Sequence, residues 1–245
     1  MTKNNFTRLF SHKPIIGMIH LAGKDSVDRV SRAVEELRIF EEEGIDGAII
    51  ENYHGSADDC YDVLMKSAEL NYNLVRGVNI LPNEFNTSFK FAHQTSSCFI
   101  QLDYVSGKYF KSKEIDSYLY NIFRKIFPDV VVLGGVWPKY YCPVKESNLE
   151  YDLKEGVERA DAIVVTGEGT GKETPINKIK QFRKIIGDYP LIVGAGLTPE
   201  NAYGQLSIAD GAVVGSCLKP ENKTSNPVDR KLVRNLMDVV RKVRE

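Results

Sequence analysis

The segment DAIVVTGEGTGKETPINKIKQFRKII, residues 161–186, contains in order a short apolar run, a glycine-rich loop and a stretch with helical spacing. A short run rich in β-branched residues that ends at turn residues is typical of a buried strand. Pro175 suits the first turn of the helix that follows, because an amide donor is not needed there. The segment therefore predicts one strand–loop–helix unit of a parallel α/β fold.

The same alternation recurs along the rest of the chain. Turn and stop residues such as Gly44 and Pro128 stand where a predicted helix ends. We predict strands at residues 14–20, 45–51, 75–80, 98–102, 130–136, 161–166, 190–194 and 211–215. We predict helices at residues 27–43, 57–70, 84–94, 113–127, 149–159, 175–186, 198–206 and 227–242.

Eight such units in 245 residues favour a (β/α)₈ barrel, the TIM barrel, for which roughly 250 residues is a typical length. An open doubly wound sheet that binds a dinucleotide needs G-x-G-x-x-G directly after a strand, and no such motif follows the first predicted strand. There is no linker or low-complexity tract. We therefore predict one α/β domain over residues 1–245, with residues 1–13 as an amino-terminal arm.

The composition narrows the class of partner. With 32 basic and 33 acidic side chains, the net charge is −1, which provides no field to attract nucleic acid or an anionic membrane surface. No stretch approaches ~20 consecutive apolar residues, and the first residues lack the apolar core of a signal peptide. The four cysteines form no C-x-x-C pair, so we expect them to be reduced. We expect a cytoplasmic protein without membrane insertion, with a symmetric homo-oligomer as the usual state.

Polar residues follow the predicted strands, and the active site of a TIM barrel lies at these carboxyl ends. Glu51 ends an otherwise apolar strand, where burial would raise its pKa toward the range useful for general acid–base catalysis. His20 titrates nearest neutrality, and Lys139 could stabilise a developing anion or form a Schiff base. We predict these three residues to be catalytic. The competing interpretation is a structural ion pair of Glu51 with Lys139 or His20.

Amide and hydroxyl side chains at the same strand ends suit hydrogen bonding to a substrate better than proton transfer. The predicted substrate-binding residues are Asn52, Asn79, Gln101 and Thr166. Oxygen and nitrogen donors for a divalent metal are also present, although their spacing encodes no ligand motif, and no other cofactor is indicated. These donors are Glu51, His20, Asp103 and Glu168.

The last three predicted strands run into the loops TGEGTG (166–171), GAGLT (194–198) and GS (215–216). Glycine lets the backbone approach a ligand and turn its N–H groups inward, which favours a phosphate. Phosphate sites in barrels commonly use the loops after strands seven and eight. The alternative is that the glycines only form tight turns. The predicted phosphate-binding residues are Gly167, Gly169, Thr170, Gly171, Gly194, Gly196, Gly215 and Ser216.

Several segments also resemble the BtpA/SgcQ family: GMIHL (17–21), GIDGAIIEN (44–52), GVNIL (77–81), VVTGEGTG (164–171), VGAGLTPEN (193–201), ADGAVVGSCLK (209–219) and NPVD (226–229). The resemblance spans nearly the whole chain and implies a barrel of the ribulose-phosphate-binding type. It implies no particular reaction, since one member is linked to photosystem I biogenesis and others to sugar metabolism. The chain has FIQLD (99–103) where the family tends to have FIRVN, so no role of a basic residue carries over there. Its first loop reads LAGKD (21–25) where a proline-rich LPG type is usual, which suggests a different rim around His20.

The leading hypothesis is an enzyme that acts on a small phosphorylated metabolite, either a sugar phosphate or a nucleotide-like compound. The phosphate would supply remote binding energy that holds the reacting end near the catalytic residues. An isomerase, a lyase and a glycosyl or nucleoside hydrolase all remain open. The alternative is a non-catalytic ligand sensor or an assembly factor for a protein complex, because the fold alone does not separate the two classes.

Overall fold

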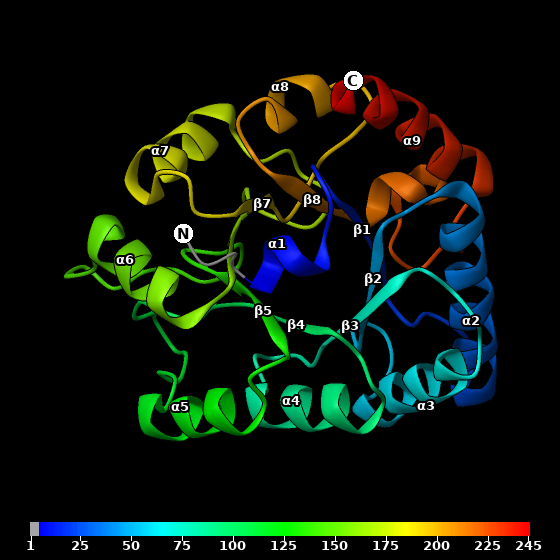
Figure 1. Cartoon of the computed structure of the whole chain (residues 1–245), viewed down its shortest axis with the longest axis horizontal. Helices are drawn as coiled ribbons and strands as arrows, with labels where there is room; N and C mark the ends of the chain where they lie inside the picture. Colours follow the sequence, from blue (N-terminus) through cyan, green and yellow to red (C-terminus); the bar gives the residue numbers. More distant parts are fainter. Residues whose placement is uncertain (1–4) are drawn as a thin grey trace.

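The computed structural model describes residues 5–245 and contains a closed barrel of parallel strands surrounded by helices (Figure 1). Neighbouring strands pair in the order β1 to β8, and β8 pairs with β1 to close the barrel. The predicted fold class is confirmed, and each predicted strand contains an observed one. The strands are β1 (Ile15–Ile19), β2 (Gly47–Glu51), β3 (Val75–Asn79), β4 (Phe99–Leu102), β5 (Val131–Gly135), β6 (Ala162–Val165), β7 (Leu191–Val193) and β8 (Gly211–Val214).

The helices follow the strands as the sequence predicts, with differences at their starts. The helix predicted from residue 113 begins at Ser117, because the Asp116 side chain caps it by accepting a hydrogen bond from the Leu119 N–H. The last helix begins at Arg230 for the same reason, with Asp229 as its cap. The helices are α1 (Asn5–Leu9), α2 (Ser26–Glu43), α3 (Ala57–Ala68), α4 (Phe85–Gln94), α5 (Ser117–Ile126), α6 (Leu149–Arg159), α7 (Ile176–Ile186), α8 (Ala202–Leu206) and α9 (Arg230–Arg244), with the 3₁₀ turns η1 (Ser216–Leu218) and η2 (Pro220–Asn222) between β8 and α9.

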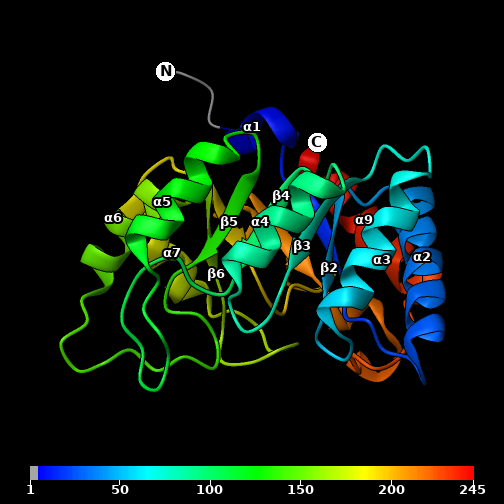
Figure 2. The same ribbon diagram turned by 90° about the horizontal axis from the view of Figure 1, so that it is seen from below.

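The amino-terminal arm contains a helix that the sequence did not predict. Residues 1–4 of the predicted arm lie outside the described residues, and α1 covers the centre of the barrel in Figure 1. Phe6 and Phe10 of this segment are buried among the inward side chains of the barrel. Figure 2 shows α1 across one end of the barrel and the longer loops at the other end. The arm therefore closes the end that carries the amino termini of the strands.

The inward side chains of the barrel alternate along each strand, as the two-residue period of a strand requires. Ile16 and Met18 of β1, for example, belong to the apolar interior, and the next inward position is His20. The inward positions at the carboxyl ends of the strands divide into two halves. On the side of β1 to β4 they are His20, Glu51, Asn79 and Gln101, and on the side of β5 to β8 they are Gly135, Thr166, Gly194 and Gly215.

Within residues 5–245, no helix combines the length and the apolar character needed to cross a membrane.

Candidate active site

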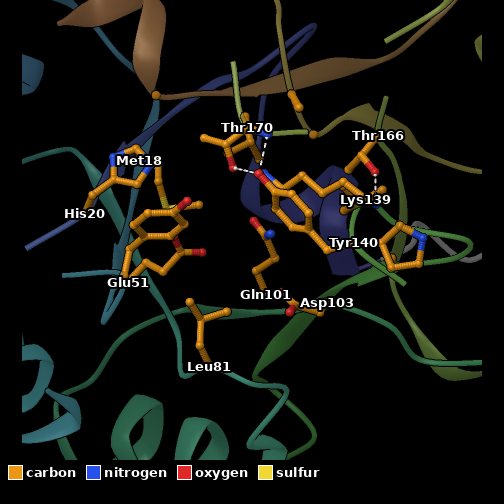
Figure 3. A pocket seen from close by; sticks show the side chains of 18 of the residues that line it. Met18, His20, Glu51, Leu81, Gln101, Asp103, Lys139, Tyr140, Thr166 and Thr170 are labelled. Atoms are coloured by element: carbon orange, nitrogen blue, oxygen red, sulfur yellow. Dashed lines mark hydrogen bonds between the residues drawn. The ribbon is translucent and has the colours of Figure 1, made fainter. Parts of the chain in front are cut away.

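A cavity of about 390 Å³ lies at the carboxyl ends of the strands, and residues that end or follow all eight strands line it (Figure 3). Polar side chains end the strands of the half formed by β1 to β4, and glycines and Thr166 end the strands of the other half, where the loop after β5 adds Lys139, Tyr140 and Tyr141. The small residues of the second half leave room that longer side chains would fill. The lining includes Met18, His20, Glu51, Tyr53, Leu81, Gln101, Asp103, Lys139, Tyr140, Tyr141, Thr166, Thr170, Gly171, Gly194, Gly196, Gly215 and Ser216.

Glu51 ends β2 and is only 7% exposed. Burial, together with the negative charge of Asp103, raises the pKa of Glu51 to about 7, against the opposing effects of Lys139 and Asn79. The Asn79 amide donates to Glu51 Oε1 at 2.8 Å, whereas Lys139 acts on this carboxyl group through its charge. A carboxyl group with a pKa near 7 can both accept and release a proton at neutral pH.

Asp103 is the second carboxyl group of the cavity, and the sequence indicated it only as a metal donor. Burial raises its pKa, while hydrogen bonds from Tyr141 and Asn79 and the charge of Lys139 lower it. The Tyr141 hydroxyl donates to Asp103 Oδ2 at 2.8 Å. The sequence could have indicated that Asp103 lines the cavity, because Asp103 lies two residues after Gln101 and side chains two residues apart along a strand point to the same side.

His20 is 3% exposed, and its Nδ1 atom has no hydrogen-bond partner among the described residues. Burial and the positive charges of Lys219 and Lys139 lower the pKa of His20 well below its ordinary value. The expectation that this histidine titrates near neutrality is therefore wrong, because the buried imidazole is held neutral. A neutral imidazole can still orient a substrate by donating or accepting a hydrogen bond.

Lys139 follows β5, and its backbone N–H donates to the Thr166 hydroxyl oxygen at 2.7 Å. Its side chain reaches into the cavity, as Figure 3 shows, and its Nζ atom lies 6.0 Å from the centre of the Tyr140 ring. The same ammonium group lowers the pKa values of Glu51, Asp103 and His20. Lys139 is thus the cation that all three acid–base groups share.

Some predicted site residues support the cavity from outside it. The Asn52 side chain is bonded to the backbone of Leu81, with 2.8 Å between its Oδ1 atom and the Leu81 nitrogen, so it holds the loop after β3. Asn79 is fully buried beside Glu51 rather than on the cavity surface. Gln101 points into the middle of the cavity in Figure 3. Gly167 and Glu168 line a shallow neighbouring groove, and Gly169 lies outside the lining of the cavity.

The glycine-rich loops after β6, β7 and β8 contact one another. Gly196 has a φ of +71°, and a Cβ atom placed on it would lie 2.1 Å from the Lys172 carbonyl oxygen. A Cβ atom on Gly171 would lie 2.7 Å from Ser216 Oγ. Over residues 5–245, the backbone N–H groups of Gly171, Gly196 and Ser216 donate to no protein acceptor. The three loops therefore leave backbone donors free beside the cavity, which is the arrangement that an anion needs.

The four donors considered for a metal are not gathered in one place. Glu168 lies in the shallow groove, whereas His20, Glu51 and Asp103 line the cavity. No group of three or more histidine, cysteine, aspartate or glutamate side chains in the described part of the chain is arranged to hold a metal ion.

Sequence comparison finds relatives along almost the full length of the chain. The model of the BtpA family matches residues 11–242. An uncharacterized protein from Pyrococcus furiosus is 31% identical over 89% of this chain and 91% of its own length. The photosystem I biogenesis protein BtpA from Synechocystis is 24% identical over 91% of this chain and 86% of its own. The putative sgc region protein SgcQ from Escherichia coli is 32% identical over 34% of this chain and 31% of its own.

Comparison with solved structures finds enzymes of the same fold. Thiamine phosphate pyrophosphorylase from Pyrococcus furiosus aligns with a TM-score of 0.65 at 15% identity, over 94% of this chain and 96% of its own. Phosphoribosyl anthranilate isomerase from Thermus thermophilus aligns with a TM-score of 0.64 at 12% identity, over 94% of this chain and 99% of its own. At these identities the likeness shows the fold alone.

Proposed function

The chain belongs to the BtpA family, and from this premise we propose that it is an enzyme that moves a proton on a small phosphorylated metabolite. A sugar phosphate or a nucleotide-like compound fits a cavity of about 390 Å³. The phosphate would bind to the loops after β6, β7 and β8, and the reacting end would lie on the side of β1 to β4.

The observation that carries this proposal is the position of Glu51. A buried carboxyl group with a pKa of about 7 lines the same cavity as glycine-rich loops with free backbone donors. Perturbed carboxyl groups in a cleft are typical of catalytic acids and bases. A glutamate that was buried only for structural reasons would not need a cavity beside it.

Each neighbouring group has a role that its geometry supports. Glu51 accepts a proton from the bound compound or returns one to it, and the Asn79 amide holds its carboxyl group in place. The Lys139 ammonium stabilises negative charge that develops on the substrate. The neutral imidazole of His20 orients a polar group of the substrate, and the phosphate supplies the remote binding energy that holds the reacting atoms near Glu51.

The enzymes that share the fold support the phosphate part of this proposal. Two of them are named for compounds that carry phosphate, a thiamine phosphate and a phosphoribosyl anthranilate. Because barrels of one fold host many reactions, this likeness favours a phosphate site and says nothing about the reaction.

Solvent deuterium exchange tests the proposal for every reaction that begins with proton transfer at carbon. A panel of sugar phosphates and nucleotides is screened for compounds that raise the thermal unfolding temperature, and each compound that binds is incubated with the protein in D₂O. We expect NMR to show deuterium incorporation at one carbon of a bound compound. Glu51→Gln should keep the binding and lower the exchange rate by roughly 10²-fold or more, because the ionisable group is gone.

Glu69→Gln is the matched control, since Glu69 is exposed at the end of α3, and it should exchange like the wild-type protein. Equal exchange rates in the wild-type protein and in Glu51→Gln would refute Glu51 as the acid–base group. A panel without any compound that binds would refute the phosphorylated substrate.

A second candidate function comes from the Synechocystis relative, which is named for photosystem I biogenesis. On that alternative, the chain uses the anion site to sense a metabolite and acts through a protein partner. Glu51→Gln would then leave its activity in cells unchanged, whereas an enzyme would lose it.

A further inference from the structure

The hydroxyl group of Tyr140 accepts a hydrogen bond from a backbone N–H group of the glycine-rich loop after β6. The Thr170 N–H donates to the Tyr140 phenol oxygen at 2.9 Å, and the phenol and the Thr170 hydroxyl oxygen are 3.2 Å apart (Figure 3). Both residues line the cavity. The tip of Tyr140 therefore covers an N–H group in a loop that we propose binds phosphate.

The surroundings of this phenol oxygen would suit an anionic oxygen. Burial alone would raise the pKa of Tyr140, but the hydrogen bonds with Thr170 and the charge of Lys139 outweigh it and lower the pKa. The free N–H groups of Gly171 and Ser216 belong to the same loop and to the loop after β8, which it contacts. A backbone N–H and a lysine ammonium group together are what proteins use to bind a phosphate oxygen.

Breaking the contact between Tyr140 and Thr170 should cost little free energy. Tyr140 is 68% exposed although its hydroxyl is hydrogen-bonded, so its departure would uncover little apolar surface. The backbone of Tyr140 has a φ of +69°, which is uncommon for a residue other than glycine. Trp137, three residues earlier, is fixed by a 2.8 Å hydrogen bond from its Nε1 atom to Asp152 Oδ2. A displacement of Tyr140 can thus be confined to the tip of the loop after β5.

From these contacts we propose that the Tyr140 hydroxyl is an internal competitor for the anion site. A phosphate oxygen replaces the phenol oxygen on the Thr170 N–H, and the loop tip that carries Tyr140 moves away from the loop after β6. The inference rests on the proposed phosphate site and adds that this site is covered in the free protein. Anion binding and the opening of the cavity are then one event.

Calorimetric titration with inorganic phosphate tests the competition. Tyr140→Phe keeps the ring and removes the competing oxygen, so we expect it to bind phosphate roughly fivefold more tightly than the wild-type protein, about the effect of one hydrogen bond. Tyr151→Phe is the matched control, because Tyr151 is 67% exposed and its hydroxyl has no partner among the described residues, and its affinity should not change. Equal or weaker phosphate binding by Tyr140→Phe would overturn the inference.

Two further measurements separate this inference from the phosphate site itself. Trp137 is the only tryptophan and lines the same groove as Tyr140, so this fixed ring should change its emission when saturating phosphate moves Tyr140 away in the wild-type protein, and an unchanged emission would count against movement of the tip. Ser216→Ala removes a hydroxyl from the proposed site. If Ser216→Ala weakens phosphate binding and Tyr140→Phe leaves it unchanged, the site stands and the competition is refuted. If no variant binds phosphate, both proposals fail.

Discussion

Glu51 keeps its proton at a pH where an exposed glutamate has lost it, and this has an energetic consequence for folding. Its pKa rises from 4.5 to about 7 because the carboxyl group is buried near Asp103. The folded protein therefore binds this proton more tightly than the unfolded chain does. The resulting stabilisation is fully present below about pH 4.5 and is lost as the pH rises to about 7, a change of roughly 3 kcal/mol at most.

The pH dependence of stability should therefore change in Glu51→Gln. Glutamine keeps an oxygen that can accept from the Asn79 amide, and it never ionises. We expect the variant to gain stability relative to the wild-type protein between pH 5 and pH 8, by roughly 2–3 kcal/mol. Urea unfolding at the two pH values measures the difference, and Glu69→Gln provides the baseline. A constant difference between variant and wild type across this range would contradict the raised pKa.

At the scale of single elements, the strands were predictable and the loops were predictable only in part. Apolar runs that end in polar or glycine residues predicted every strand, because the barrel buries both faces of each strand. Their positions at the ends of predicted strands also placed Glu51, Gln101 and Gly215 at one rim. The caps at Asp116 and Asp229, in contrast, depend on local hydrogen bonds that compete with helical spacing, so the helix starts shifted by a few residues.

Contacts between distant loops could not be predicted, because each depends on residues that only the closed barrel brings together. The Asn52 side chain had the right chemistry to bind a substrate, yet it accepts a hydrogen bond from the backbone N–H of Leu81. Tyr140 followed a predicted site residue in the sequence, but its contact with Thr170 joins the loops after β5 and β6. The neutral state of His20 likewise depends on burial and on Lys219, which lies beyond β8.

The contact between the loops after β6 and β7 predicts a difference between two glycine substitutions. Gly196→Ala places a Cβ atom 2.1 Å from the Lys172 carbonyl oxygen at a φ of +71°, so strain and overpacking add up to roughly 2–4 kcal/mol. Gly44→Ala has a φ of +83° with its nearest neighbour atom 4.0 Å away, so only the backbone strain of ~1 kcal/mol applies. Urea unfolding of both variants measures the difference. Similar losses of unfolding free energy in the two variants would mean that the loop after β6 moves away from the new Cβ atom without an energetic cost.

At the scale of the whole molecule, the two ends of the barrel differ in structure. The carboxyl ends of the strands carry the cavity, and the amino ends are closed by α1 and Phe10. The sequence predicted the first end from its polar and glycine residues. It did not predict α1, since a helix of five residues shows too little periodicity, and its apolar side chains gain a partner only when the barrel is closed.

This division predicts that stability can be lowered at one end without an effect on binding at the other. Phe10 is 6% exposed, its ring centre lies 5.5 Å from that of Phe99, and its Cε1 atom lies 3.0 Å from the position of a Cβ atom on Gly47. Phe10→Ala should therefore leave a cavity among close-packed side chains and cost about 3 kcal/mol or more. Phe110→Ala is the control, because Phe110 is 66% exposed and its loss should change stability by less than about 0.5 kcal/mol. Calorimetry on the folded Phe10→Ala protein should give the wild-type affinity for inorganic phosphate, since the anion site lies at the opposite rim. A loss of that affinity in a protein that is still folded would show that the two ends are coupled through the barrel interior.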